Sequence, residues 1–479
     1  MNDHVVTAAA SLQQLLTQSH VRARMLRSIA RNLNDARNLI IATCSQESAL
    51  TSEELAPEFA RMTRTLEMFA DVVDDGRWTR AAISPKESDP TKAIGPNHDV
   101  RSMLIPLEGA AIVFGASNFP LAYGVCGGDT GSALAAGCPV VVKEHPAHPH
   151  TGKLIAQLAR EAIANSGLNP DVLCYAEDDG KQTAAIAKSL IQHEHAAAVG
   201  FTGSVKVGLL LDSLARERPI PIPVFAEMGS TNPVFVTTAA AKSRGNQIGT
   251  MLADSILSRF GQQCTCPGLI FVSEADAALL REAMVARFAK APSRDMLTTN
   301  VRDTYVRRLK ECTALDRITT IAGGKHPGNE RDASATLLET SLKHYESNPT
   351  LHEEIFGPAA ILITTPAQSL PSHTSLKGTL TATVFGEVAP DEAKLETESA
   401  LKAATAIAGR VIFNGVPTGV RVAPGMVHGG PLSSTNRPDT TAVGPMAIER
   451  WCRPVCFQNW TEQLLPSEVQ NSEFPRMSR

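Results

Sequence analysis

The amino-acid sequence predicts an α/β fold in which short parallel strands alternate with amphipathic helices. Between residues 139 and 227, short apolar segments are separated by segments in which apolar side chains recur at helical spacing. A second run of the same kind begins near residue 232. This alternation is typical of βαβ units, whose strands are parallel. The strands are expected at residues 139–143, 172–175, 197–201, 223–227 and 232–236.

The first part of the chain is expected to be helical. Apolar residues recur at helical intervals through residues 1–75, and one of these helices is expected to begin at Ser52. Residues 82–99 are rich in Pro, Lys, Asp and Gly and predict a loop. Residues 103–106 and 109–114 then predict two strands around a turn.

The helices of the α/β part follow its strands. Thr151 is expected to cap a helix that stops at Gly167. Residues 323–334 predict a surface turn region, because glycine, proline and charged residues dominate them. Further helices are expected at residues 181–192, from the turn at 202–204 through Leu214, before Cys264 and at 275–290. A further strand is expected at residues 269–273.

Composition excludes several functional classes. The chain has 479 residues, so two or three domains are expected. A net charge of −4 with scattered lysines and arginines gives no case for nucleic-acid binding. No signal peptide and no apolar run long enough for a bilayer is found, so a membrane is not an expected partner. Nine dispersed cysteines suit a reducing compartment, and a cytoplasmic location is expected.

One cysteine lies where a nucleophile would be expected. A helical run ends at Gly261, two glutamines follow, and Pro267 with Gly268 prevents the helix from continuing. Cys264 therefore lies on a turn between a helix and a strand, where nearby backbone N–H groups favour a thiolate and stabilise an oxyanion. On the local sequence alone, a buried structural cysteine is an equally good interpretation.

Three other turns place polar residues after strands. Gly203 and Ser204 lie between a strand and a helix, where a helix N-terminus binds phosphate, although the pattern is not Gly-x-Gly-x-x-Gly. Asn118 lies on a turn before Phe-Pro, from which its amide could donate to an oxyanion. Glu227 ends an apolar strand, where α/β sheets place ligands and where burial favours a general base. The plainer interpretations are an ordinary strand–helix turn, an asparagine bonded to its own backbone and an exposed acid.

The histidine clusters do not predict a metal site. His145, His148 and His150 lie among prolines, without a helical i, i+4 pair or a nearby acidic ligand. His193 and His195 form only a short pair. We therefore expect no metal.

Six short motifs occur in a fixed order along the chain. They are Asn-Phe-Pro at 118–120, Val-Val-Lys at 141–143, Phe-Thr-Gly-Ser at 201–204, Glu-Met-Gly at 227–229, Gly-Gln-x-Cys at 261–264 and Glu-x-Phe-Gly-Pro at 354–358. In this order they resemble the aldehyde dehydrogenase superfamily over most of the chain. Longer stretches are most similar to α-ketoglutaric semialdehyde dehydrogenases and related NADP-linked fatty aldehyde dehydrogenases; they include residues 113–122, 132–143, 223–230 and 426–431.

The resemblance implies an NAD(P)-dependent aldehyde dehydrogenase with a covalent intermediate. Cys264 would be the nucleophile, with Asn118 and the Cys264 backbone N–H stabilising the oxyanion. After hydride transfer to the nicotinamide, Glu227 would activate the water that hydrolyses the thioester. The implied cofactor contacts are Lys143 with a ribose or phosphate, Ser204 beside Gly203 with the pyrophosphate, and Glu354 and Phe356 with the nicotinamide ribose and ring.

Three positions depart from the wider pattern of the superfamily. Many members that prefer NAD carry Glu three residues after the lysine, where this chain has Pro146. An acid there would repel a 2′-phosphate, so its absence favours NADP, with NAD as the alternative, and His148 is a candidate to approach that phosphate. Gln263 is expected to touch the substrate. Cys266 is interpreted as a passive side chain rather than a redox partner of Cys264.

The favoured reaction is oxidation of α-ketoglutaric semialdehyde to 2-oxoglutarate. An arginine should bind a substrate carboxylate, and Arg259, Arg421 and Arg244 are the candidates. The alternatives are an NADP-linked dehydrogenase of uncharged aliphatic or aromatic aldehydes, a CoA-acylating enzyme, a cofactor-free thiol hydrolase and a catalytically silent structural or binding protein with the same fold. Glu227 argues against a CoA-acylating enzyme, and the cofactor motifs argue against a thiol hydrolase.

The resemblance also implies three structural parts. A Rossmann-like cofactor-binding domain would comprise residues 1–89 and 113–229, and an α/β catalytic domain residues 230–447. A β oligomerisation arm with the C-terminal segment would comprise residues 90–112 and 448–479. Because such an arm has no partner surface within its own subunit, a homodimer or homotetramer is expected.

Overall fold

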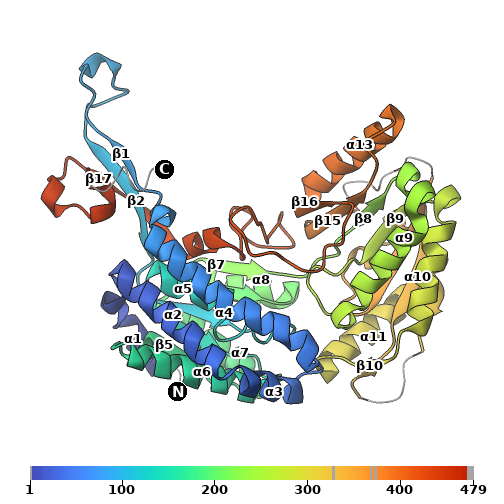
Figure 1. Cartoon of the computed structure of the whole chain (residues 1–479), viewed down its shortest axis with the longest axis horizontal. Coiled ribbons are helices and arrows are strands. Elements are labelled where there is room, and N and C mark those ends of the chain that lie inside the picture. The colour runs from blue at the N-terminus through green and yellow to red at the C-terminus, as the bar shows by residue number, and fades with distance from the viewer. Residues whose placement is uncertain (1–2, 326–329, 367–368, 370, 372–374, 472–479) are drawn as a thin grey trace.

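The computed structural model describes residues 3–325, 330–366, 369, 371 and 375–471. It has two lobes, each built on its own sheet, and a narrow arm that projects from the first lobe (Figure 1). The first lobe carries the N-terminal helices, and the segment that follows the last strand of the second lobe returns to the first (Figure 1). The predicted α/β class is confirmed.

The helical prediction for the first 75 residues is confirmed. Helix α4 begins at Ser52, as expected, with a reciprocal cap in which the Thr51 hydroxyl accepts from the Glu54 N–H and the Glu54 carboxylate accepts from the Thr51 N–H. Gly76, at φ 76°, ends this helix in the left-handed conformation that glycine tolerates best. The four helices are α1 (Asp3–Ala10), α2 (Ser19–Asp35), α3 (Arg37–Glu47) and α4 (Ser52–Asp75).

The first sheet has five strands in the order β5-β4-β3-β6-β7, and all neighbouring pairs are parallel. This is the doubly wound order, whose direction reverses between β3 and β6, and ligands bind such sheets at the carboxyl ends of the strands. The strands are β3 (Ala110–Phe114), β4 (Val140–Lys143), β5 (Leu173–Ala176), β6 (Ala196–Thr202) and β7 (Val224–Glu227). The helices between them are α5 (Gly128–Ala136), α6 (Pro149–Asn165), α7 (Thr183–Gln192) and α8 (Val205–Arg216).

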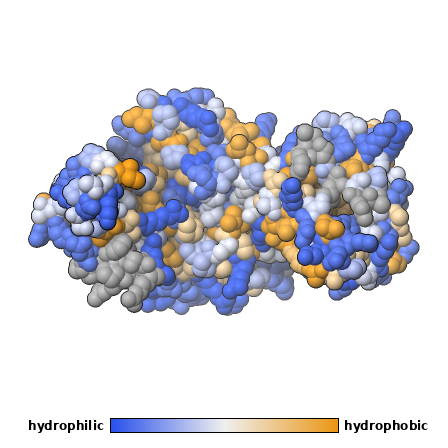
Figure 2. Space-filling view, turned by 90° about the horizontal axis from the view of Figure 1, so that it is seen from above, coloured by the Kyte–Doolittle hydropathy of each residue, from blue (hydrophilic) through white to orange (hydrophobic). Residues whose placement is uncertain are grey.

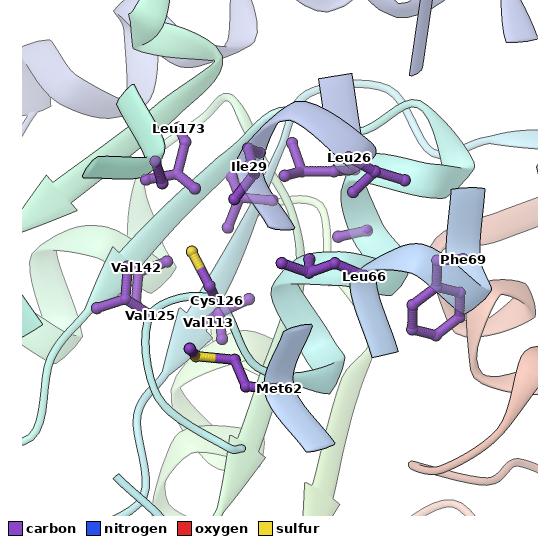
Figure 3. Close-up of a cluster of buried hydrophobic side chains, with 14 of the residues drawn as sticks. Leu26, Ile29, Met62, Leu66, Phe69, Val113, Val125, Cys126, Val142 and Leu173 are labelled. Carbon is purple, nitrogen blue, oxygen red and sulfur yellow. The ribbon is translucent and has the colours of Figure 1, made fainter. Parts of the chain in front are cut away.

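The largest core of the first lobe joins its helices to this sheet (Figure 3). Met62, Leu66 and Phe69 from α4 lie among side chains of α2 and of the strands, each at most 1% exposed. Burying one such side chain stabilises the fold by roughly 1.5–3 kcal/mol. Helix α4 is therefore fixed on the sheet, which fixes the position of its remaining polar face. The labelled partners are Leu26, Ile29, Val113, Val125, Cys126, Val142 and Leu173.

The second sheet has seven strands in the order β11-β13-β14-β9-β8-β15-β16, and only the edge strand β11 is antiparallel to its neighbour. Its strands are β8 (Val234–Val236), β9 (Leu269–Ser273), β11 (Thr319–Gly323), β13 (Thr336–Ser341), β14 (Ala359–Thr365), β15 (Thr379–Phe385) and β16 (Ala408–Phe413). Its helices are α9 (Thr238–Leu257), α10 (Ala278–Lys290), α11 (Thr299–Thr313), α12 (Leu342–Ser347) and α13 (Asp391–Ile407). Two short strands, β10 (Arg294–Asp295) and β12 (Asp332–Ala333), pair beside it. Thus the turn predicted at 323–334 contains a strand, and its residues 326–329 lie outside the described residues.

The arm is an antiparallel sheet of β1 (Ala82–Ser84), β2 (Val100–Pro106) and β17 (Cys452–Gln458), in the order β1-β2-β17. The two strands expected around a turn are therefore present, but they do not pair, because β2 lies in the arm and β3 in the first sheet. All five residues of β3 are buried, as a strand covered on both faces requires, whereas β2 is only partly buried. The sequence predicts a loop where β1 lies. The predicted domain boundary at residue 89 would place β1 in a different part of the protein from β2 and β17, the other strands of its sheet. The domain boundaries otherwise stay a prediction.

The predicted cap of α6 is wrong. The helix begins at Pro149, so Thr151 lies in its first turn. The N–H groups of His150 and Thr151 instead donate to the carboxylate of Glu47, which reaches across from α3. A carboxylate at a helix N-terminus also interacts favourably with the helix dipole. Local sequence could not reveal a capping residue a hundred positions away.

Candidate active site

The polar turns named above converge between the two lobes. Asn118 follows β3, and its Nδ2 donates to the carbonyl oxygen of Gln262 at 3.2 Å. Gln262 belongs to the loop that carries Cys264 in the second lobe. Because an amide nitrogen has two N–H groups, Asn118 keeps one donor for an oxyanion while the other holds the nucleophile loop.

The nucleophile loop is a tight left-handed turn. Arg259, Phe260 and Gly261 have φ values of 48°, 54° and 66°. A Cβ added to Gly261 would lie 2.1 Å from the carbonyl oxygen of Gly357, so only glycine fits here. The close approach joins the Gly-Gln-x-Cys motif to the Glu-x-Phe-Gly-Pro motif, which lie far apart in the sequence.

A single buried amide fixes the far side of this loop. Nδ2 of Asn232 donates to the carbonyl oxygens of Cys264 at 2.8 Å and Cys266 at 2.9 Å. Its Oδ1 accepts from the hydroxyls of Ser230 at 2.7 Å and Thr381 at 2.9 Å. Asn232 is 1% exposed, so its hydrogen bonds replace those that water would have made.

A histidine that the sequence interpretation did not assign lies beside the thiol. Nε2 of His428 is 3.6 Å from Sγ of Cys264, and its Nδ1 is 3.7 Å from Oε2 of Glu227. His428 and Glu227 are both buried, and an isolated bridge between Glu227 and Thr435 brings this late segment back to the first lobe. The stretch 426–431 contributed to the resemblance, but nothing in its local pattern indicated that it would reach Cys264.

The site holds the imidazole of His428 in its charged form. Burial lowers its pKa, but Tyr123, Cys264 and Glu227 together raise the pKa of His428 well above its usual value. A protonated imidazole next to sulfur stabilises the thiolate, the form that attacks carbonyl carbon. The imidazole of His428 therefore lies between the predicted nucleophile, Cys264, and the predicted base, Glu227, and is close to both.

Glu227 is placed to act on water. Its Oε2 is buried without a hydrogen bond to any described residue, because the separation from His428 is too long for one. An unsatisfied buried carboxylate oxygen is costly and suits a bound water molecule. The predicted role of Glu227 in hydrolysis agrees with this geometry and stays a prediction.

The predicted cofactor residues lie on the strand ends of the first sheet. Lys143 ends β4, and its Nζ is 2.5 Å from Oδ2 of Asp178, both side chains being buried. Gly203 and Ser204 are exposed at the N-terminus of α8, where the Ser204 hydroxyl accepts from the Val207 N–H. An exposed helix N-terminus after a strand of a doubly wound sheet fits the pyrophosphate of a dinucleotide.

Glu354 and Phe356 line a cavity on the cofactor side of the nucleophile loop, together with Gln263 and Cys266. Burial raises the pKa of Glu354 to about 7, although a hydrogen bond from the Ser230 backbone opposes the shift. A half-buried carboxyl that forms no ion pair with the described residues fits a ligand that donates hydroxyl groups, as a ribose does. Gln263 donates to the carbonyl oxygen of Ser258 at 3.1 Å, and its predicted contact with substrate stays a prediction.

One expectation about the adenosine end needs correction. His148 does not face a phosphate: its Nε2 contacts the carbonyl oxygen of Ala116 at 3.1 Å, and its Nδ1 lies 3.1 Å from Oε1 of Glu144. An acid does lie beside Lys143, because Asp178 supplies the carboxylate that Pro146 does not. Asp178 follows β5, so position 146 alone could not reveal it, and the choice between NADP and NAD stays a prediction.

The structure shows the surroundings of Cys266 and of two of the candidate arginines. Burial raises the pKa of Cys266, which keeps its thiol protonated and agrees with a passive side chain. Among the candidate arginines, Arg259 pairs with Glu58 at 2.8 Å and Arg244 with Glu387 at 2.8 Å. Among the residues that the structure describes, no group of three or more His, Cys, Asp or Glu converges as a metal site would require. Nor does any described helix have the length and apolar character needed to cross a bilayer.

A half-buried cysteine beside a buried imidazole, with an amide donor, a buried carboxylate and a doubly wound sheet, fits a dehydrogenase that uses a cysteine nucleophile and a dinucleotide cofactor. Residues 2–448 match the model of the aldehyde dehydrogenase family, and the chain belongs to that family. The predicted enzyme class and NAD(P) dependence are thus confirmed.

Similar proteins agree with this assignment. The α-ketoglutaric semialdehyde dehydrogenase 2 of Azospirillum brasilense is 38% identical over 94% of this chain and 85% of its own length. The α-ketoglutaric semialdehyde dehydrogenase of Acinetobacter baylyi is 36% identical over 97% of this chain and 88% of its own. The structure of the glyceraldehyde-3-phosphate dehydrogenase GapN of Methanocaldococcus jannaschii, complexed with NADP, superposes with a TM-score of 0.77 at 16% identity. That comparison covers 95% of this chain and 93% of the other, and it supports the fold.

Replacing His428 should slow reaction of the thiol. We expect His428→Gln to be alkylated by iodoacetamide about tenfold more slowly than the wild type near pH 6.5, because the thiolate loses its neighbouring cation. Since the pKa of His428 is raised, the imidazole stays charged through neutral pH, and the wild type should keep its advantage over the variant there. The variant's rate should rise steeply with pH. Mass spectrometry of the Cys264 peptide measures both profiles.

His352→Gln provides a matched control, because His352 is half-buried and hydrogen-bonded to the Tyr345 carbonyl. It should keep the wild-type profile. Identical pH profiles for His428→Gln and the wild type would show that the imidazole does not influence the thiol.

Proposed function

We propose that this enzyme oxidises α-ketoglutaric semialdehyde to 2-oxoglutarate, with water as the acyl acceptor. The observation that carries the proposal is the similarity, over nearly the whole chain, to two curated enzymes with this activity in their names. The hydrolytic outcome is supported by Glu227, whose buried carboxylate lies on the far side of His428 from the thiol.

The proposed reaction begins with the Cys264 thiolate, which adds to the aldehyde carbon to give a thiohemiacetal. The free N–H of Asn118 and the backbone N–H of Cys264 stabilise the oxygen that becomes negative. The charge on His428 stabilises the thiolate before attack and is no longer balanced by sulfur once the bond has formed. A bound nicotinamide, whose ribose and ring Glu354 and Phe356 would hold, would supply the hydride acceptor that converts the thiohemiacetal into a thioester on Cys264.

Hydrolysis of the thioester completes the proposed cycle. Glu227 takes a proton from water as the water oxygen attacks the thioester carbon. The carbon–sulfur bond breaks, the carboxylic acid is released, and the thiolate returns beside the imidazolium of His428. Glu227 then loses its proton to solvent, so the site is ready for another aldehyde.

A dehydrogenase of uncharged aldehydes is the second candidate, because the walls near Tyr123 are largely apolar. The two candidates differ in whether the substrate has a second charged end. A panel of aldehydes, with reduced nicotinamide followed by absorbance, separates them. We expect kcat/KM for α-ketoglutaric semialdehyde to exceed that for pentanal or benzaldehyde by about 10- to 150-fold, because a charged hydrogen bond contributes roughly 1.5–3 kcal/mol.

The panel is read with both NAD and NADP, and Cys264→Ala serves as the inactive control. Equal rates for charged and uncharged aldehydes would favour the second candidate. No turnover of any aldehyde would support a catalytically silent protein instead.

Replacing Glu227 should separate the two halves of the reaction. Glu227→Gln should still form the thioester and release a burst of reduced cofactor close to one equivalent per active site. Turnover should then fall by about 100-fold or more, because hydrolysis loses its general base. Rapid-mixing absorbance resolves the burst from the steady state. Glu217→Gln, an exposed acid after α8, is the control, and a steady state for Glu227→Gln equal to it would contradict the assigned role.

We also propose that the protein is a homodimer or a pair of dimers. Support comes from the arm, whose three strands project from the first lobe (Figure 1), and from exposed apolar residues on α8 and after β17. The face seen from above shows hydrophobic groups between hydrophilic ones (Figure 2). Exposed apolar surface of this kind is covered in many oligomers. These exposed residues are Val205, Val207, Leu209, Leu210, Trp460 and Leu464.

Light scattering coupled to size exclusion tests the proposal. At micromolar concentration we expect a mass of two or four times 51.0 kDa. Leu209→Lys with Leu210→Lys should lower that mass by placing charge in the covered surface. A wild-type mass of one chain would contradict the proposal.

A further inference from the structure

Two arginines lie near the thiol without an acidic partner. Nη2 of Arg61, on α4, donates to the hydroxyl of Tyr123 at 2.9 Å, and the guanidinium carbon lies 5.2 Å from the centre of that ring. The Tyr123 ring is 6.4 Å from the ring of His428, which contacts Cys264. The second arginine, Arg410, lies on β16 of the other lobe. The chain of contacts therefore leads from α4 to the reacting sulfur.

The charges of Arg61 and Arg410 are not neutralised by the protein. Among the described residues, neither arginine forms an ion pair, and Arg410 instead donates to the carbonyl oxygens of Pro417 and Gly419. Both side chains are partly buried. A partly buried cation without an anion is unfavourable, and a ligand that supplies the anion relieves this cost.

The two arginines influence one site. Burial lowers the pKa of Arg410, and the charge of Arg61 lowers it further. The neighbouring groups Cys264 and Tyr123 raise the pKa of Arg410. Arg410 also donates to the carbonyl oxygen of Gly419, the residue before Val420, and Val420 packs against the cluster that contains Tyr123. Two like charges at one site favour an anion between them.

The surroundings of Tyr123 suit a short carbon chain. The buried side chains around it are small or apolar, so they offer no hydrogen bonds to the middle of a substrate. A substrate with an aldehyde at one end and a carboxylate at the other would match a thiol, an apolar wall and a cationic end in that order. The apolar residues are Ala116, Ala122, Ala442 and Val443, with Phe119, Val420, Val422 and Met426 packed against them.

We propose that Arg61, with Arg410 and the Tyr123 hydroxyl, binds the carboxylate of the substrate and so selects an aldehyde acid over an uncharged aldehyde. This inference rests on the proposed function. The arginines expected from the sequence do not fit this role: Arg259 and Arg244 are already paired with Glu58 and Glu387, and Arg421 is exposed. A planar guanidinium presents two parallel donors to a carboxylate, which suits this end of the site.

The test compares two five-carbon substrates, α-ketoglutaric semialdehyde and pentanal. In Arg61→Gln, the ratio of kcat/KM for the charged substrate to kcat/KM for pentanal should fall about 100-fold, mostly through KM for the charged substrate. Arg61→Lys keeps the charge without the fork and should lower the ratio by about tenfold. Arg64→Gln, an exposed arginine one turn further along α4, should keep the wild-type ratio.

A binding measurement gives a second readout that does not depend on turnover. Glutarate, a dicarboxylate of the same length, should slow alkylation of Cys264 by iodoacetamide in the wild type and in Arg64→Gln. The protection should be lost in Arg61→Gln at the same glutarate concentration. Circular dichroism confirms that each variant is folded, and Arg61→Lys gives the test if Arg61→Gln is not.

The outcomes separate this inference from the proposed function. If the wild type strongly prefers the charged substrate and Arg61→Gln keeps both that ratio and the protection by glutarate, the role of Arg61 is overturned while the proposed function stands. If the wild type itself shows no preference for the charged substrate, the proposed function fails and the inference fails with it.

Discussion

The geometry of the whole site depends on one buried amide. Asn232 holds the nucleophile loop by donating to the carbonyl oxygens of Cys264 and Cys266, while the hydroxyls of Ser230, two residues earlier in the chain, and of Thr381, on β15, hold its own oxygen. Losing these hydrogen bonds would leave buried polar atoms unsatisfied, at about 1–3 kcal/mol for each group. Asn232 also has a φ of 45°, a left-handed conformation that asparagine tolerates better than most residues. A rigid loop keeps the sulfur of Cys264 at a fixed position relative to Asn118 and His428.

The second constraint is that the site needs both lobes. The thiol comes from the seven-stranded sheet, the carboxylate of Glu227 from the five-stranded sheet, and His428 from a late segment that returns between them. Each lobe supplies groups that are unsatisfied by themselves, namely a charged imidazole, a buried carboxylate oxygen and two arginines without acids. The fold tolerates this cost because large apolar cores fix each lobe separately. A substrate with an aldehyde and a carboxylate would satisfy several of these groups at once.

Much of the fold was predictable because its signals are local. Apolar strands of four or five residues, helical spacing and the order of six motifs predicted the α/β class and the parallel sheet, and the Thr51–Glu54 cap follows from a known local pattern. The errors arose where distant residues decide. Glu47 caps α6 in place of Thr151, and β2 joins β17, which is separated from it by more than three hundred residues. Such pairings leave no periodicity in a single sequence.

By itself, the sequence determined the residue types that can do the chemistry and the turns that carry them, because a cysteine between a helix and a strand, and an asparagine and a glutamate at strand ends, are defined by their neighbours in the chain. Only the tertiary structure decided which groups share one space. It placed His428 beside Cys264, paired Lys143 with Asp178, and left Arg61 without an acid while Arg259 received one. The physical reason is that charge and burial depend on what surrounds a side chain in three dimensions, and most of those neighbours lie far away along the chain.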